Sequence, residues 1–527
     1  MPTLEWIGKD KVVNHDKEVP YRVLERQYSY DEAGQHAEDN SSENMIIHGD
    51  NLEALKALLP RYEGKVKCIY IDPPYNTGNE GWVYNDNVND PKIKKWLGEV
   101  VGKEGEDLSR HDKWLCMMYP RLKLLQRLLR DDGAIFISID DTEQSNLRLI
   151  CDEIFGTGNF ISDVIWQHSV QANGYGGKFV SQFNHTLVYS KSSSQFVLGN
   201  LPRSDADNKL YKNPDNDPRG PWRAGYCVNG LYRPNLKYEI QTPSGNIISP
   251  PEKGWRWSKE TMQAKIDSGE IIFNADETAI IHKLYLSDLN GKVPENIWAG
   301  GIAGTTRQAT TELKVIFDGK APFDTPKPTC LIERIIQIAS DPGSIILDSF
   351  SGSGTTAHAV LNMNKADGGH RKFILVEMMD YADNITAERV KRVIQGYGEG
   401  KKTVEGTGGN FSYYELGPVL LMPDGNLNEA VGVQKIREYV YYMETKESLP
   451  TEQPAAEPYF MGLCRNTAYY FYYEREHVTT LDYTFLSTIQ TKAEGYTIYA
   501  DLCAIPQETL RKHNITFKKI PRDIARL

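Results

Sequence analysis

The chain has 527 residues, of which 40% are hydrophobic and 25% are charged, and its net charge at pH 7 is −11. These proportions are typical of a soluble globular protein, and the length suits three or four domains. No apolar run approaches the ~20 residues that a membrane span requires. A polar N-terminus with charges of both signs argues against a signal peptide. Seven scattered cysteines without a CxxC pair argue against a metal site or a disulfide framework. We therefore expect a cytoplasmic protein that binds no metal.

Changes in composition along the chain predict five segments. Two of them alternate short apolar runs with amphipathic stretches, which predicts a doubly wound, mostly parallel α/β sheet. A loop-rich insert, with many Asn, Gly, Pro and Trp residues, separates these two halves, and a Gly-rich run precedes a smaller C-terminal α/β domain. The predicted segments are an N-terminal arm (1–44), a first half (45–190), the insert (191–320), a second half (321–402) and a C-terminal domain (403–527).

The first half begins with a predicted strand at 45–50 and a helix at 51–59, whose leucines recur near the 3.6-residue period. A short apolar, β-branched run, 67–71, predicts the next buried strand. An amphipathic helix at 113–129 follows, and then a strand at 134–139 and a helix at 143–154. Further strands are expected at 160–166 and 186–189.

The strand at 67–71 ends at Asp-Pro-Pro-Tyr, residues 72–75. Two consecutive prolines lack N–H groups and fix φ, so the chain must leave the sheet as a rigid, extended loop. A carboxylate, two outward-facing carbonyls and an aromatic ring then lie at the carboxyl end of a strand, where ligands bind in open α/β sheets. Such a loop suits a planar base with an exocyclic amine, although an ordinary strand exit remains the alternative.

The second half contains a predicted helix at 329–339, a strand at 344–347, a strand at 373–376 and a helix at 382–394. Between the two strands, Gly352 and Gly354 allow a tight turn and a close approach of the backbone to a ligand. Glu377 ends the next strand, at a spacing suited to ribose hydroxyls. There is no third glycine and no basic loop for phosphates. A ribose ligand without phosphate, such as S-adenosylmethionine, therefore fits better than a dinucleotide.

The pair of motifs, Asp-Pro-Pro-Tyr and Phe-Ser-Gly-Ser-Gly-Thr-Thr (350–356), is similar to the signature of DNA amino-methyltransferases. Their order resembles the β class of adenine-N6 enzymes. Residues 48–55 resemble that family's acidic strand-end motif, and 323–328 resemble its Pro-Lys-Pro element. Residues 76–79 and 84–87 resemble the modification subunits of type III restriction systems. One departure is Ser349, where proline is common in the family.

The resemblance implies direct methyl transfer from S-adenosylmethionine to the N6 amine of a flipped adenine in double-stranded DNA. It assigns the catalytic roles to Asp72, Pro73, Pro74 and Tyr75. Asp50 has simple helix capping as its alternative role, and Lys327 could equally be a solvated loop residue. The implied cofactor-binding residues are Asp50, Asn51, Lys327, Asp348, Phe350, Gly352, Gly354, Thr355 and Glu377.

The insert is the expected target-recognition region. Five arginines could read guanine edges or hold phosphates: Arg219, Arg223, Arg233, Arg256 and Arg307. The basic run 389–392 is interpreted as a solvated face, with phosphate contact as the alternative. The resemblance further suggests a homodimer and a separate restriction subunit. Two other functions remain open, namely a DNA-recognition subunit that guides a partner nuclease and a cytosine-N4 methyltransferase.

Overall fold

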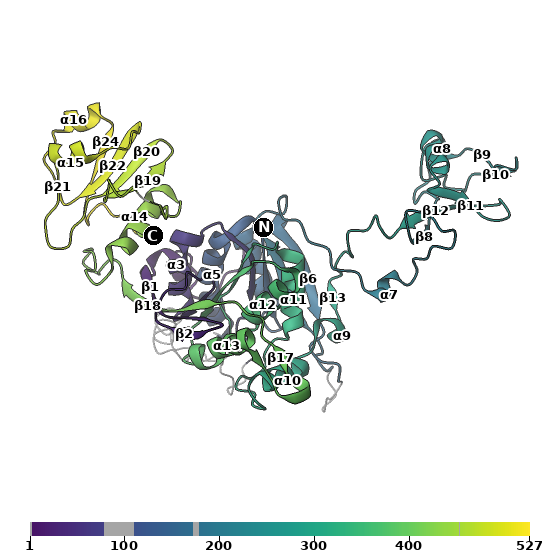
Figure 1. Cartoon of the computed structure of the whole chain (residues 1–527), viewed down its shortest axis with the longest axis horizontal. Coiled ribbons are helices and arrows are strands. Elements are labelled where there is room, and N and C mark those ends of the chain that lie inside the picture. Colours follow the sequence, from purple (N-terminus) through teal and green to yellow (C-terminus); the bar gives the residue numbers. More distant parts are fainter. Residues whose placement is uncertain (1–2, 78–109, 172–178, 453) are drawn as a thin grey trace. The chain divides into compact units, whose positions relative to one another are not determined.

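The computed structural model describes residues 3–77, 110–171, 179–452 and 454–527 (Figure 1). Residues 78–79 and 84–87, which carry part of the family resemblance, therefore lie outside the described residues. The chain divides into two compact units, one formed by 1–198 with 295–527 and the other by 199–294. Within the described ranges, no helix is both long and apolar enough to cross a membrane.

Among the described residues, the larger unit is built on a sheet of eleven strands, in the order β13-β6-β7-β5-β4-β14-β15-β3-β18-β1-β2. Neighbouring strands are parallel from β5 to β18 and between β13 and β6, and the other pairs are antiparallel. The strands are β13 (Ile297–Trp298), β6 (Phe160–Trp166), β7 (Asn184–Ser190), β5 (Leu129–Ile139), β4 (Val66–Ile71), β14 (Ile345–Asp348), β15 (Lys372–Glu377), β3 (Met45–His48), β18 (Phe411–Val419), β1 (Arg22–Asp31) and β2 (Gly34–His36).

The sheet has a switch point between β4 and β14. The chain runs from β4 to β5 on one side and from β14 to β15 on the other, although β4 and β14 pair directly with each other. Because the two central strands are parallel, their carboxyl ends meet at one edge of the sheet, where ligands bind in doubly wound folds. The predicted doubly wound, mostly parallel α/β fold is confirmed.

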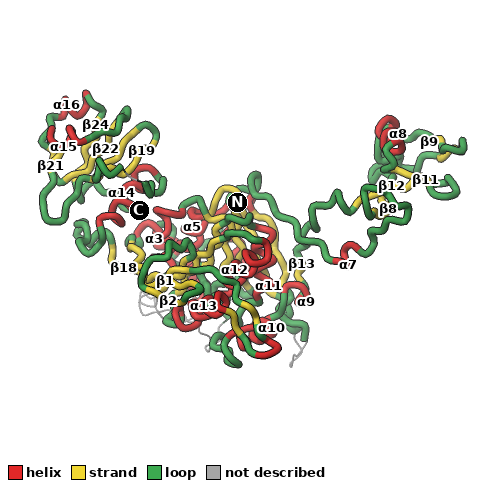
Figure 2. Tube along the Cα trace, viewed as in Figure 1, coloured by secondary structure: helices red, strands yellow, loops and turns green. Residues whose placement is uncertain are grey.

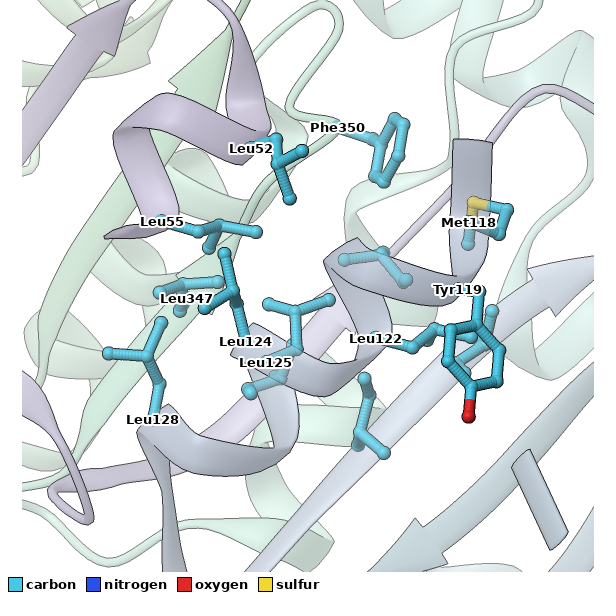
Figure 3. Packing of buried hydrophobic residues seen from close by; sticks show 14 of the residues in the cluster. Leu52, Leu55, Met118, Tyr119, Leu122, Leu124, Leu125, Leu128, Leu347 and Phe350 are labelled. Carbon is cyan, nitrogen blue, oxygen red and sulfur yellow. The ribbon is translucent and has the colours of Figure 1, made fainter. Parts of the chain in front are cut away.

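Helices cover both faces of the sheet. Leucines of α3 (Asn51–Tyr62) and α5 (Arg110–Leu128) pack with α6 (Gln144–Phe155) against inward-facing strand residues, and Figure 3 shows Leu347 and Phe350 within this cluster. Alternate residues of a strand point to opposite faces of the sheet, so the other face needs its own cover. There α11 (Thr329–Ala339) packs against β4 and β5, and α12 (Thr355–Asp367) packs against β15. The helix α13 (Glu388–Gln395) lies beside α12. The helix predicted at 382–394 begins as a π-helical stretch at Ala382–Ala387.

The N-terminal segment is not a separate arm. After the short helices α1 (Lys9–Val12) and α2 (His15–Glu18), β1 joins the large sheet by pairing with β18, which lies almost 400 residues away in sequence. Strand β18 also pairs with β3, so residues 411–419, which were expected in the C-terminal domain, belong to the large sheet. Long-range pairing of this kind is decided by tertiary contacts.

The rest of the C-terminal region forms a second sheet, in the order β19-β20-β22-β24 (Figure 1). The helix α14 (Val433–Thr445) precedes it and packs against α3. The elements are β19 (Phe460–Cys464), β20 (Thr467–Phe471), β21 (Thr480–Leu481), α15 (Tyr483–Thr488), β22 (Gly495–Ala500), β23 (Leu502–Cys503), α16 (Gln507–Lys512) and β24 (Ile515–Lys519).

Residues 199–294 form the smaller unit, which consists mostly of loops around short strands and one longer helix (Figure 2). It is narrower than the insert expected at 191–320, because β13 and α10 (Thr306–Ile316) belong to the larger unit. A small core surrounds Trp255 and Met262. Its elements are α7 (Asp205–Asn208), β8 (Trp222–Gly225), β9 (Ile240–Gln241), β10 (Ile247–Ile248), α8 (Lys259–Asp267), β11 (Ile271–Phe273) and β12 (Ile280–Tyr285).

Candidate active site

The Asp-Pro-Pro-Tyr loop leaves β4 at the switch point and is fixed by side chains from two helical segments. Trp114 of α5 donates its indole N–H to the carbonyl of Pro74 at 2.7 Å. The next residue, Asn76, adopts a left-handed φ of 59° and donates its amide to the fully buried carboxylate of Glu143, beside α6. His111 is hydrogen-bonded to that carboxylate at 2.6 Å. The prolines and these contacts together make the loop rigid.

Two acceptors of this loop remain available. Asp72 Oδ1 is buried and forms no hydrogen bond of standard geometry with the described residues, although the Tyr75 hydroxyl lies near enough to this carboxylate for their interaction to add to the raised pKa of Tyr75. Within the same part of the chain, no donor is bonded to the carbonyl of Pro73. Tyr75 is 8% exposed, and burial together with the negative charge of Asp72 raises its pKa well above 10, so its hydroxyl stays protonated. One carboxylate oxygen, Oδ1, and one carbonyl oxygen can together accept two hydrogens from an amine.

The glycine loop connects β14 to α12. Gly352 and Gly354 have φ values of 49° and 79°, a region that favours glycine. A Cβ on Gly352 would lie 2.9 Å from the ring of Phe323, and one on Gly354 would lie 3.0 Å from the carbonyl of Thr386. Both positions therefore favour glycine by conformation, and a side chain at either would also crowd a neighbouring residue.

Two buried carboxylates stabilise the glycine loop from within. Glu377 accepts the backbone N–H of Gly352 at 2.8 Å. Asp348 accepts the N–H of Phe350 at 3.0 Å and the hydroxyl of Thr356 at 2.6 Å. Burial raises the pKa of Asp348 to about 7, with a smaller contribution from the nearby carboxylates of Asp72 and Glu377. Both oxygens of Asp348 are thus engaged by the loop itself.

Arg389 is a site residue that the sequence interpretation missed. It was expected on a solvated face, but its side chain is only 1% exposed. Its guanidinium donates to the hydroxyls of Ser353 at 3.0 Å, Thr355 at 2.8 Å and Thr329 at 3.1 Å. It also donates to Nδ1 of His358 at 3.1 Å, because burial keeps the pKa of this histidine far below 6.5 and its ring neutral.

A signal for Arg389 was present in the sequence. Arg389 lies four residues before Val393 on α13, so it shares the buried face of this helix. Arg392 does lie at the surface, where it pairs with Glu388 and Asp318. The basic run therefore divides between a buried and a solvated face.

The two loops line one cavity of about 640 Å³. Most of the predicted site residues contribute to it, together with Arg307 at the start of α10, and the walls also include His168, Thr305 and Phe323. The predicted residues that line the cavity are Asp72, Pro73, Pro74, Tyr75, Lys327, Asp348, Phe350, Gly352, Thr355 and Arg307.

The remaining predicted cofactor residues lie outside this lining. Gly354 and Glu377 support the glycine loop from behind. Asp50 lies at a second cavity of about 610 Å³ and accepts the N–H groups of Leu52 and Glu53, so it caps α3. Asn51 is buried and donates to the carbonyl of Ser349 at 3.3 Å, which connects α3 to the glycine loop.

Lys327 makes a contact that differs from the expected cofactor role. Its ammonium forms an ion pair with Asp72 Oδ2 and lies 5.1 Å from the centre of the Tyr75 ring. The Pro-Lys-Pro element is therefore in direct contact with the Asp-Pro-Pro-Tyr loop.

The other four arginines expected to contact DNA belong to the smaller unit and are exposed. Arg219 pairs with Asp217, and its guanidinium lies 4.4 Å from the centre of the Tyr285 ring. Arg223 donates to the hydroxyl of Tyr211 at 2.9 Å. Arg256 lies beside Trp257. Arg233 is exposed.

A protein-family model described as DNA methylase matches residues 66–388, which include both loops of the cavity. The chain belongs to this DNA methylase family. It is 34% identical over 421 residues to the StyLTI Mod subunit, a type III restriction-modification enzyme of Salmonella typhimurium, covering 74% of this chain and 62% of that relative. It is 32% identical over 447 residues to the Escherichia coli EcoP15I Mod subunit, covering 75% and 66%.

A shorter relative matches over more of its own length. The type II methyltransferase M.KpnI of Klebsiella pneumoniae is 32% identical over 366 residues, which cover 64% of this DNA methylase and 81% of the relative. The chain thus spans about two thirds or less of the length of the Mod subunits that it matches. The predicted relationship to type III modification subunits is confirmed at the level of sequence similarity.

Proposed function

We propose that this DNA methylase transfers a methyl group from S-adenosylmethionine to the N6 amine of an adenine flipped out of double-stranded DNA. One observation carries the proposal: the rigid Asp-Pro-Pro-Tyr loop and the glycine loop line the same cavity. An amine acceptor and a methyl donor must meet within bonding distance, and two loops at adjacent strand ends provide this proximity.

On the base side, Asp72 Oδ1 and the Pro73 carbonyl would each accept one hydrogen of the amine. These hydrogen bonds orient the nitrogen and favour its more nucleophilic, tetrahedral form. The Tyr75 ring would stack on the base and offset part of the few kcal/mol that extrusion from the duplex costs. Trp114 and Glu143 hold this loop in place through Pro74 and Asn76.

On the cofactor side, the residues present suit S-adenosylmethionine. The turn at Gly352 has no space for a side chain, and Phe350 and Thr355 line the cavity beside it. Bound S-adenosylmethionine would supply the electrophilic methyl group. The N6–carbon bond would form as the sulfur–carbon bond breaks, S-adenosylhomocysteine would leave, and the nitrogen would release one proton to solvent. Glu377 and Arg389 fix the loop through Gly352, Ser353 and Thr355, so on this side of the site these two residues contribute geometry.

The test is incubation of the purified chain with isotope-labelled S-adenosylmethionine and unmethylated plasmid DNA, followed by mass analysis of the nucleosides. Labelled N6-methyladenine is the expected product. Labelled N4-methylcytosine would show that the target base is cytosine and would contradict the proposed adenine target. Unlabelled DNA across varied sequence contexts would contradict the proposed activity.

We further propose that the chain acts in the cytoplasm as the modification component of a restriction-modification system, as a homodimer with a separate restriction subunit. The names of the Mod subunits at 34% and 32% identity support this context. The exposed arginines of the smaller unit are the proposed contacts to the recognition sequence. Light scattering after size-exclusion chromatography tests the dimer, and co-purification with a co-expressed restriction subunit tests the partnership.

A further inference from the structure

Lys327 connects the two halves of the methylase site. It lies between Pro326 and Pro328, so the backbone on both sides has little freedom. Its carbonyl accepts the hydroxyl of Thr355, the first residue of α12, at 3.3 Å. Its side chain reaches the other half of the sheet, where the ammonium pairs with Asp72. One residue therefore contacts both the glycine loop and the Asp-Pro-Pro-Tyr loop.

The Lys327 side chain is largely buried by these contacts. It is 11% exposed and its partner Asp72 is 24% exposed. The ammonium also lies near the face of Tyr75, at 5.1 Å from the ring centre, a distance at which a cation is attracted by the ring. A flexible lysine held at a carboxylate and above an aromatic ring has given up side-chain entropy, which favours a defined role.

The charges around Asp72 explain why a cation is placed there. Asp348 ends the adjacent strand, and the charge of Asp72 contributes to its raised pKa. The charge of Asp72 also raises the pKa values of Tyr70 and Tyr75, after the larger effect of burial. Among the described residues, Lys327 is the cation that forms an ion pair with Asp72.

Two further groups face this pair from other elements. His168 follows β6, and burial together with the charge of Lys327 lowers its pKa, so it adds no positive charge near neutral pH. Asp140, after β5, contributes a further negative charge near Tyr75. Arg307 lines the same cavity, but among the described residues Lys327 is the cation in direct contact with the Asp72 carboxylate.

We propose that Lys327 is a positioning residue for Asp72 and does not act as a ligand of the cofactor. By binding Oδ2, the ammonium fixes the rotation of the carboxylate and leaves Oδ1 directed to the amine of the target base. It also offsets the repulsion between two carboxylates at adjacent strand ends. This inference rests on the proposed methyl transfer and deepens it.

The inference predicts a separation between cofactor affinity and the rate of methyl transfer. In Lys327→Met, the Asp72 carboxylate can rotate, and small misplacements of a reacting group cost about 100-fold in rate. We therefore expect a rate at saturating S-adenosylmethionine that is about 10- to 100-fold lower, and a Kd for S-adenosylmethionine within about threefold of the original. Lys327→Arg keeps a cation at Asp72 and should recover most of the rate.

The experiment uses the full chain, with calorimetric titration of S-adenosylmethionine and tritium transfer to unmethylated plasmid DNA. Lys365→Met is the matched control, because Lys365 pairs with Glu405 at the surface of the same unit. The double variant Lys327→Met with Asp72→Asn should transfer methyl groups no more slowly than Asp72→Asn alone, since Lys327 acts through Asp72. Melting temperatures of all variants identify any loss of folding. If Lys327→Met does not fold, Lys327→Gln is measured in its place.

The outcomes separate the inference from the function on which it rests. A Kd raised more than about tenfold, with a full rate at saturation, would assign Lys327 to the cofactor and overturn the inference. An unchanged rate and Kd in Lys327→Met would overturn it as well. Methyl transfer by the unmodified chain establishes the activity independently of either result, and its absence would refute the proposed function and the inference together.

Discussion

The two aspartates at the switch point occupy equivalent places and have opposite environments. Asp72 follows β4 and Asp348 ends the adjacent parallel strand β14. Both oxygens of Asp348 accept hydrogen bonds from its own loop, whereas Asp72 pairs through Oδ2 and leaves a buried Oδ1 without a hydrogen bond of standard geometry to the described residues. A buried acceptor without a partner costs free energy, so the unpaired Oδ1 of Asp72 indicates a functional group. The fully paired carboxyl of Asp348 indicates a structural role.

The largest expected effect tests the functional side of this comparison. Asp72→Asn presents an N–H where the carboxylate accepted hydrogens, so methyl transfer should fall by about 100- to 1,000-fold. The melting temperature should change little, because the loop is held by Trp114 and Glu143. Tritium transfer and thermal unfolding are the measurements. A rate for Asp72→Asn close to that of the unmodified chain would remove Asp72 from the chemistry.

Asp348→Asn tests the structural side. The raised folded pKa of about 7 means that folding favours the protonated carboxyl. The unfolded state loses its proton near pH 4, so the contribution of Asp348 to stability is present at low pH and is lost as pH rises from about 4 to about 7. Asparagine carries no charge; its oxygen can accept the N–H of Phe350, and its NH₂ group can donate to the hydroxyl of Thr356.

We therefore expect Asp348→Asn to have a higher free energy of unfolding than the unmodified chain above about pH 7, by up to about 4 kcal/mol, and a similar one near pH 4. Urea unfolding at both pH values measures the difference. The control is Asp341→Asn, because Asp341 precedes β14 and is 70% exposed. If the difference in unfolding free energy between Asp348→Asn and the unmodified chain did not change with pH, burial would not raise the pKa of Asp348.

Arg389→Met tests the support of the glycine loop. The substitution leaves the hydroxyls of Ser353, Thr355 and Thr329 without their donor. It should therefore lower the free energy of unfolding by about 1–3 kcal/mol. S-adenosylmethionine should bind about tenfold more weakly, which corresponds to about 1.4 kcal/mol. Calorimetric titration measures the affinity. Arg392→Met on the exposed face of the same helix is the control and should bind normally.

The smallest effect concerns the support of the Asp-Pro-Pro-Tyr loop. Trp114→Phe removes the N–H that binds the Pro74 carbonyl and should cost about 1 kcal/mol of unfolding free energy with a fewfold slower methyl transfer. Trp298→Phe removes a similar bond, from the indole to the carbonyl of Glu295 at 2.8 Å, away from the loop. It should cost similar stability without slowing the reaction. Equal rates in the two variants would show that Trp114 does not position the loop.

The sequence predicted those parts of the fold that depend on local patterns. The helix at 329–339 coincides with α11, and the strands expected at 344–347 and 373–376 overlap β14 and β15. Apolar periodicity, prolines and glycines specify such elements because they act within a few residues. Pairing of β1 with β18 was not predictable in this way, since it depends on partners from opposite ends of the chain.

For the site, the sequence alone determined that an acidic, proline-stiffened loop and a glycine turn each follow a buried strand. It also supplied the family resemblance that the DNA methylase match confirms. Only the tertiary structure decided which charges are paired, because the partners lie far apart in sequence. Lys327 reaches Asp72 across 255 residues, and Arg389 reaches Thr329 across 60. The strength of a charge or hydrogen bond depends on burial and on spatial neighbours, which a linear pattern does not contain.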